Sequence, residues 1–167
     1  MTRRSFGLEA VALSCAFAAL SCGSKGAVVV TAVISSASAQ IEQPSSLASL
    51  LVGGFTLHVE LGQVAPSSTD VSPEGFSLVR PSDQQTLVVL HFTTAPDKPY
   101  HLEPGASAEI AATIADQLGT SGQQLTTDEA TAICTARTVQ IAGSVSDTAT
   151  GKPTPLSSSS FDVTGCP

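Results

Sequence analysis

The chain has 167 residues, of which 42% are hydrophobic, so it can form one domain with a substantial core. Tryptophan is absent and aromatic residues make up only 4%, so we expect that core to be mainly aliphatic. The formal net charge of −7 argues against nucleic acid as a partner, because nucleic-acid binding requires clustered Lys and Arg.

The N-terminus has the features of an export signal. Arg3 and Arg4 precede an apolar run over Ala10–Leu20, which is too short to span a bilayer. The run ends in Ala19-Leu20-Ser21-Cys22, followed by Gly23. This motif resembles the lipobox of bacterial lipoproteins, whose cysteine is lipidated and becomes the first residue of the mature protein. The resemblance implies lipidation of Cys22 and a membrane anchor. By the same resemblance, Gly23 rather than Asp after the cysteine permits export to the outer membrane.

Two alternatives for processing remain open. A second Ala-Leu-Ser-Cys motif ends at Cys15, after a shorter apolar run. A second apolar run covers Ala27–Ile34, and Ala37-Ser38-Ala39 fits the small-x-small site of ordinary signal peptidase. Cleavage after Ala39 would release a soluble secreted protein. Both routes lead out of the cytoplasm.

We therefore expect three parts: an export signal over residues 1–21, a lipidated N-terminus over 22–46, and a β-sandwich domain over 47–167. In the second part, a tether leads to a possible first strand over Ala27–Ile34. The following residues, Ser35–Ser46, are small and polar, and they predict a loop or linker.

Alternating apolar and polar residues predict half-buried strands over residues 55–61 and 108–114. Before the first of them, Leu47–Val52 starts a strand that we expect to break at Gly53-Gly54. Further strands are predicted around Phe76–Leu78 and over Thr86–Phe92. The second of these is nearly continuously apolar, which favours a central strand buried on both faces.

Loops and turns are predicted between these strands. The segments rich in Pro, Gly, Ser or Gln are Gly62–Pro73, Ala95–Gly105 and Leu118–Gln124. Within them, Glu103-Pro104-Gly105 has the order of a type II turn. Thr126 with Glu129 forms a potential capping box that opens one or two helical turns, up to Ile133.

The last third of the chain predicts a hairpin closed by a disulfide between Cys134 and Cys166, which lie beyond the leader and are free to oxidise outside the cytoplasm. If the two cysteines lie directly opposite each other, the residue numbers of every facing pair in the hairpin sum to 300. The midpoint is then Thr150, which lies in the turn-rich segment Asp147–Pro153. In this register Val139 faces Phe161 on the core face. Ser157 to Ser160 would form a polar edge strand.

Six to eight short strands without a long helical period favour an all-β fold. We expect an antiparallel β-sandwich of about seven strands that is immunoglobulin-like in architecture only. The alternative is a small β-barrel.

Three histidines, His58, His91 and His101, could in principle converge on Zn²⁺ or Cu²⁺. Their spacing matches no metal motif, and the chain contains no Gly-x-Ser-x-Gly nucleophile elbow. We therefore expect neither a cofactor nor enzymatic activity.

The function that the sequence favours is that of an extracytoplasmic, lipid-anchored module with a binding or structural role. Its partners would be the membrane, through the lipid, and an unidentified protein or glycan at the three long loops. The competing hypothesis is a secreted, soluble metal-binding or hydrolytic protein that uses the three histidines.

Overall fold

The computed structural model describes residues 30–45, 48–95 and 99–166. The expected export signal, Cys22 and the tether lie outside these residues. The described elements are, in chain order, β1 (Val30–Ser45), β2 (Ala48–Leu61), β3 (Thr69–Val79), β4 (Thr86–Val89), β5 (Phe92–Ala95), β6 (Tyr100–Leu102), β7 (Ser107–Ile114), β8 (Gln123–Leu125), α1 (Thr127–Ala136), β9 (Thr138–Asp147), β10 (Thr154–Ser157) and β11 (Phe161–Asp162).

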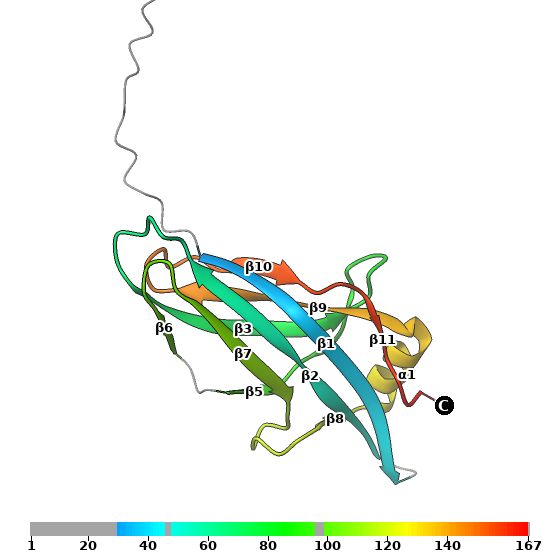
Figure 1. Cartoon of the computed structure of the whole chain (residues 1–167). Helices are drawn as coiled ribbons and strands as arrows, with labels where there is room; N and C mark the ends of the chain where they lie inside the picture. The colour runs from blue at the N-terminus through cyan, green and yellow to red at the C-terminus, as the bar shows by residue number, and fades with distance from the viewer. Residues whose placement is uncertain (1–29, 46–47, 96–98, 167) are drawn as a thin grey trace, which may run out of the picture.

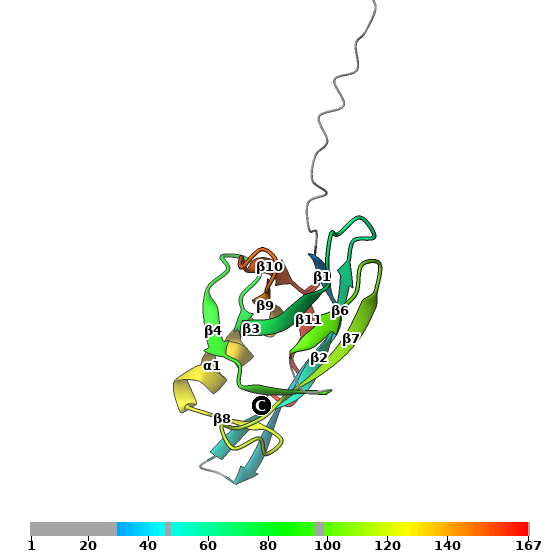
Figure 2. The same cartoon turned by 90° about the vertical axis from the view of Figure 1, so that its left-hand side faces the viewer.

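The strands form two antiparallel sheets that face each other (Figures 1 and 2). The first sheet has the order β1-β2-β7-β5, with β8 also paired to β2. The second has the order β10-β9-β3-β4, with β11 paired to β9 and β6 to β3. The predicted all-β sandwich is confirmed, with eleven strands among the described residues where about seven were expected. Both sheets are open, so the barrel alternative is wrong.

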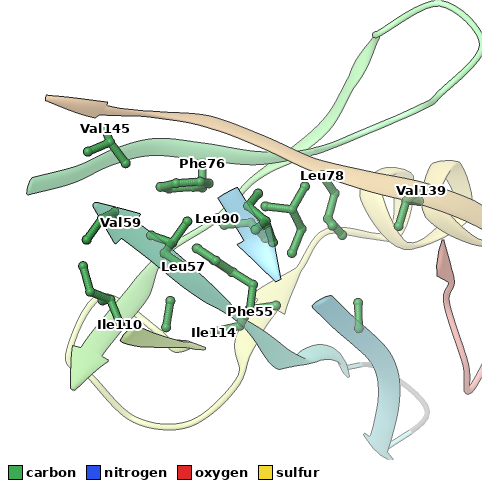
Figure 3. Close-up of a cluster of buried hydrophobic side chains, with 14 of the residues drawn as sticks. Phe55, Leu57, Val59, Phe76, Leu78, Leu90, Ile110, Ile114, Val139 and Val145 are labelled. Carbon is green, nitrogen blue, oxygen red and sulfur yellow. The ribbon is translucent and has the colours of Figure 1, made fainter. Parts of the chain in front are cut away.

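The core lies between the two sheets and draws side chains from both (Figure 3). Three phenylalanines meet at its centre: the ring of Phe76 lies 4.6 Å from that of Phe55 and 5.5 Å from that of Phe92, measured between centroids. Gly143 leaves room for the Phe76 ring, since a Cβ at this position would lie 2.6 Å from Phe76 Cγ. Apart from Tyr100, the other buried residues of the core are aliphatic, as the composition predicted.

The largest correction concerns β1. The sequence predicted a loop or linker over Ser35–Ser46, whereas β1 continues through Ser45 and pairs with β2 along its length. A one-residue register shift between Ile34 and Ser36 explains the error. Before this bulge the even-numbered side chains point inward, and after it the odd-numbered ones do, so no single alternation covers the strand.

A bulge also explains why the sequence did not predict the start of β3. Residues Thr69–Pro73 were predicted as part of a loop, but they pair with β9 and β6. The register shifts between Glu74 and Ser77, where Gly75 adopts a positive φ of 62°. A glycine in this left-handed conformation is typical of a bulge.

Two further predictions differ from the structure. Strand β2 runs without a break through Gly53-Gly54. The apolar run over Thr86–Phe92 is not one central strand: β4 lies at the end of its sheet, and the chain crosses at Leu90 and His91 to β5 in the other sheet. Leu90 is buried at this crossing, which explains why the run is apolar without being one strand.

Strand β7 and the buried residues of β2 agree with the predicted alternation. The turn before β7 is also confirmed, because the Ala106 amide donates to the Glu103 carbonyl oxygen at 2.9 Å and Gly105 has a φ of 80°. A positive φ at the third residue is what a type II turn requires.

The predicted capping box is present at the start of α1. The Thr126 side chain accepts from the Glu129 amide, and the Glu129 carboxylate accepts from the Thr126 amide at 2.8 Å. The helix continues past the expected end at Ile133 to Ala136. It therefore includes Cys134, which we had placed at the start of a strand.

The Cys134–Cys166 disulfide is present, but it joins α1 to the chain beyond β11 and does not lie within the hairpin. The predicted register holds next to it, since Phe161 pairs with Val139. Val139 is fully buried, whereas Phe161 is only half-buried.

Nearer the turn, the register differs by one residue from the predicted one: Thr154 lies opposite Val145, whereas the prediction places Pro155 there. The extra residue lies in Ser158–Ser160, which interrupts the second arm between β10 and β11. Ser158 is buried there: its hydroxyl accepts from the Ile141 amide at 3.0 Å. The serine run is therefore a bulge with one anchored residue, and the prediction of a continuous edge strand was wrong.

Candidate functional site

The three histidines lie on different elements and do not converge. His58 is on β2 in the first sheet, His101 is on β6 in the second, and His91 lies between β4 and β5. The His58 ring nitrogen Nδ1 is 2.8 Å from the Glu109 carboxylate on the neighbouring strand β7. This pair is exposed to solvent, where such a contact contributes little to stability.

His101 lies between two carboxylates. Its Nδ1 is 2.8 Å from Asp70 Oδ1, and its Nε2 is 3.2 Å from Glu103 Oε1. The hydrogen bond to Asp70, followed by the one to Glu103, raises the pKa of His101 above its ordinary value of 6.5. When the ring is protonated, it donates to both carboxylates, and in that form neither nitrogen has a lone pair for a metal.

His91 lines a cavity of about 430 Å³ that also contains the side chains of Glu74 and Asp116. Both carboxylates are engaged: Glu74 accepts from the Ser146 hydroxyl at 2.8 Å, and Asp116 accepts from the amides of Leu118 and Thr120. Across the described part of the chain, no three His, Cys, Asp or Glu side chains lie together as a metal site requires.

A groove of about 470 Å³ lies at the end of the molecule opposite the start of β1. The β1–β2 hairpin extends to this end of the sandwich, and α1 lies alongside it (Figure 1). Strands β1, β2 and β8 and helix α1 contribute the lining, which consists of Ile41, Gln43, Ser45, Ala48, Ser49, Leu125, Thr127, Ala130, Thr131, Cys134 and Thr135.

Helix α1 forms one wall because its two faces differ. Ile133 is fully buried on the core side. Thr127, Thr131 and Cys134 lie at helical spacing on the other side, where they line the groove. The capping box fixes where the helix begins and hence which face is turned to the groove.

The chemistry of the groove is that of a neutral surface. Its polar groups are hydroxyls and the amide of Gln43, its apolar groups are aliphatic, and neither a charged nor an aromatic side chain is among those that line it. Such a surface can donate and accept hydrogen bonds with an uncharged ligand. None of its hydroxyls contacts a histidine that could activate it as a nucleophile.

Sequence reasoning missed this groove. It pointed to the loops Gly62–Pro73, Ala95–Gly105 and Leu118–Gln124, whose residues do not line the groove. The available signal was the run of threonines, Thr127, Thr131 and Thr135, on one side of a short capped helix.

Among the described residues, no helix has the length and apolar character needed to cross a membrane. Compared with known proteins, the chain matches no family model, no curated protein sequence and no solved structure.

Proposed function

We propose that this chain is an extracytoplasmic β-sandwich module, anchored to the outer membrane by a lipid on Cys22, with a binding or structural role and no enzymatic activity. The observation that carries the proposal is the extent of β1. Its first residue, Val30, pairs with Leu61, and its last, Ser45, pairs with Ala48.

Cleavage after Ala39 would remove residues 30–39, ten of the sixteen residues of β1. Val30, Ile34 and Ala39 are buried in the core, so a chain starting at Gln40 would lose these contacts and expose the edge of β2. A mature chain that starts at Cys22 retains all of β1 and has seven residues, 23–29, between the lipid and the sandwich. This comparison favours lipidation over secretion.

The disulfide provides a second, weaker argument. Structural disulfides persist mainly in oxidising compartments outside the cytoplasm. Cys134 and Cys166 are joined in the folded domain, which is compatible with export by either route.

The position of the groove supports a binding role. Strand β1 has 16 residues, so at ~3.3 Å per residue it spans roughly 50 Å from the anchored end to the groove end. Because the lipidated Cys22 precedes Val30 in the chain and the groove lies at the other end of β1, the attachment of the anchor leaves the groove open to a protein or glycan of the envelope. Its neutral lining favours an uncharged ligand surface.

Incorporation of a labelled fatty acid during expression in a bacterial host tests the anchor. We expect label in the wild-type protein and in Cys15→Ser, and none in Cys22→Ser. Cys15→Ser is the matched control, because it changes the same residue type in the same leader. Label that persists in Cys22→Ser, or an unlabelled wild-type protein in the soluble fraction, would refute the proposal and favour the secreted form.

A further inference from the structure

The C-terminal segment, residues 161–166, covers part of the outer edge of β1. Thr164 lies parallel to Gln40: the Ile41 amide donates to the Thr164 carbonyl oxygen at 2.9 Å, and the Thr164 amide donates to the Ala39 carbonyl oxygen at 3.2 Å. Gly165 has a φ of 76°, and a Cβ there would collide with the Ile41 carbonyl oxygen. The segment therefore makes a single parallel bridge to β1 and fits closely against it.

Besides its two hydrogen bonds to β1, the segment is held by short-range contacts with β9 and the residue before it. Strand β11 contributes two residue pairs with β9, the Val163 amide donates to the Arg137 carbonyl oxygen at 2.8 Å, and the Thr138 hydroxyl donates to Asp162 at 2.8 Å. Val163 is the one buried residue of the segment. Segments with few buried contacts open locally at a low free energy. The disulfide from Cys166 to Cys134 on α1 prevents such opening.

The disulfide lies between two surface depressions, from which a reductant can approach it. Both cysteines are half-buried. Cys134 lines the groove described above, and Cys166 lines a separate depression of about 400 Å³ beside Arg137. A dithiol attacks one sulfur of the bridge and forms a mixed disulfide, which releases the first protein thiol. The second thiol of the reductant then displaces the other protein sulfur and closes the reductant's own disulfide. In total, two electrons and two protons pass from the dithiol to the cystine.

We infer that the outer edge of β1 is a docking site for the C-terminal segment of a second copy of this chain, and that the Cys134–Cys166 disulfide controls access to it. Once the segment is released, the β1 edge has unpaired backbone groups at Ala39 and Ile41, and unpaired edges accept strands. The segment of another copy fits this edge, because each contact that it makes within its own chain is available in the partner. Such an exchange is domain swapping.

The bulge between β10 and β11 supplies a hinge. Ser158 stays fixed, since its amide also donates to the Ile141 carbonyl oxygen at 2.8 Å. Ser159 and Ser160 follow it and are exposed. A change of backbone angles at these two residues redirects the segment without disturbing β10. The inference does not depend on the lipid anchor.

The test uses two versions of the full chain, both carrying Cys15→Ser and Cys22→Ser. One also carries Cys166→Ser and keeps Cys134, and the other carries Cys134→Ser and keeps Cys166. After mixing and mild oxidation we expect a disulfide-linked heterodimer in which Cys134 of one copy is joined to Cys166 of the other, because a swapped segment brings these sulfurs together.

Two controls accompany the mixture. Adding Gly165→Val to the copy that keeps Cys166 blocks docking and should abolish the heterodimer, while urea unfolding checks that this copy remains folded. The chain that retains both cysteines should sediment as a monomer when oxidised and reach twice that mass under a dithiol as concentration rises. A reduced chain that stays monomeric or forms open-ended aggregates would overturn the inference. A heterodimer yield unchanged by Gly165→Val would also overturn it.

Discussion

The packing of Phe76 against Gly143 gives a quantitative test of the sandwich. Replacing Gly143 by Ala would place a Cβ 2.6 Å from Phe76 Cγ and 2.8 Å from Cε1. Phe55 and Phe92 pack against the same ring, so a shift of the Phe76 ring would disturb these contacts as well. Overpacking of this kind costs about 1–3 kcal/mol, so we expect Gly143→Ala to lower the free energy of unfolding by that amount.

In a Phe76→Ala background, Gly143→Ala should leave the free energy of unfolding almost unchanged, because no ring is left to collide with. Phe76→Ala by itself lowers this free energy by about 3–5 kcal/mol. The coupling energy of the double-mutant cycle should therefore be about 1–3 kcal/mol. Urea unfolding of the four variants, followed by far-UV circular dichroism, measures it. Ser144→Ala, at the next position of β9, is the matched control and should change stability by less than about 0.5 kcal/mol. An equal cost of Gly143→Ala in both backgrounds would refute this packing.

Further predictions follow from the disulfide, the hairpin and the histidines. Replacing Cys134 and Cys166 with Ala should lower the free energy of unfolding by roughly 3–4 kcal/mol, because the bridge spans 32 residues; an unchanged melting temperature would contradict this. Phe161→Ala should cost roughly half of the ~3–5 kcal/mol of a buried Phe, because Phe161 is half-buried; a full loss in urea unfolding would place its ring in the core. NMR titration should give a His101 pKa above 6.5 that falls in Asp70→Asn. The resulting stability is fully present below pH 6.5 and is lost as pH rises through the raised pKa. Elemental analysis after dialysis should find no stoichiometric zinc or copper; bound metal that is lost when the histidines are replaced would revive the metal-binding alternative.

Alternation predicted those strands whose register is unbroken. In β7 and the second half of β2, all inward side chains within each strand have residue numbers of one parity and all outward side chains have the other. The sequence period of two therefore matches the structure. In β1 and β3 a bulge exchanges the two parities, at Ser35 and near Gly75. Small residues around Ser35 weakened the signal further, and both segments consequently looked like loops.

The two cysteines were used to predict both a disulfide and the register of the C-terminal hairpin, and these two predictions had different outcomes. The pairing of Val139 with Phe161 was predicted by placing the two cysteines opposite each other, and the shared odd parity of the apolar residues agreed with it; the structure has this pair. The assumption that Cys134 and Cys166 face each other across the hairpin failed, because Cys134 belongs to the last turn of α1. Residues of equal parity share one face of a strand. The cysteines have even numbers and the core residues of the hairpin have odd numbers, which indicated that the cysteines do not belong to the core face of the same hairpin.

The groove was beyond sequence reasoning for a different reason. It forms where the β1–β2 hairpin and α1 meet, and residues as far apart as Gln43 and Thr135 line it. No local pattern encodes that contact. The threonines of α1 show only that one helix face is polar.

The mass of the N-terminal peptide of the mature protein, purified from the envelope of an expressing bacterium, is the most direct test of the proposed function. We expect a peptide that begins at Cys22 and carries more than one acyl chain. Loss of lipid mass in Cys22→Ser, but not in Cys15→Ser, would identify the modified residue. A mature protein that begins at an unmodified Gln40, and therefore lacks residues 30–39 of β1, would contradict both the anchor and the role assigned to that strand.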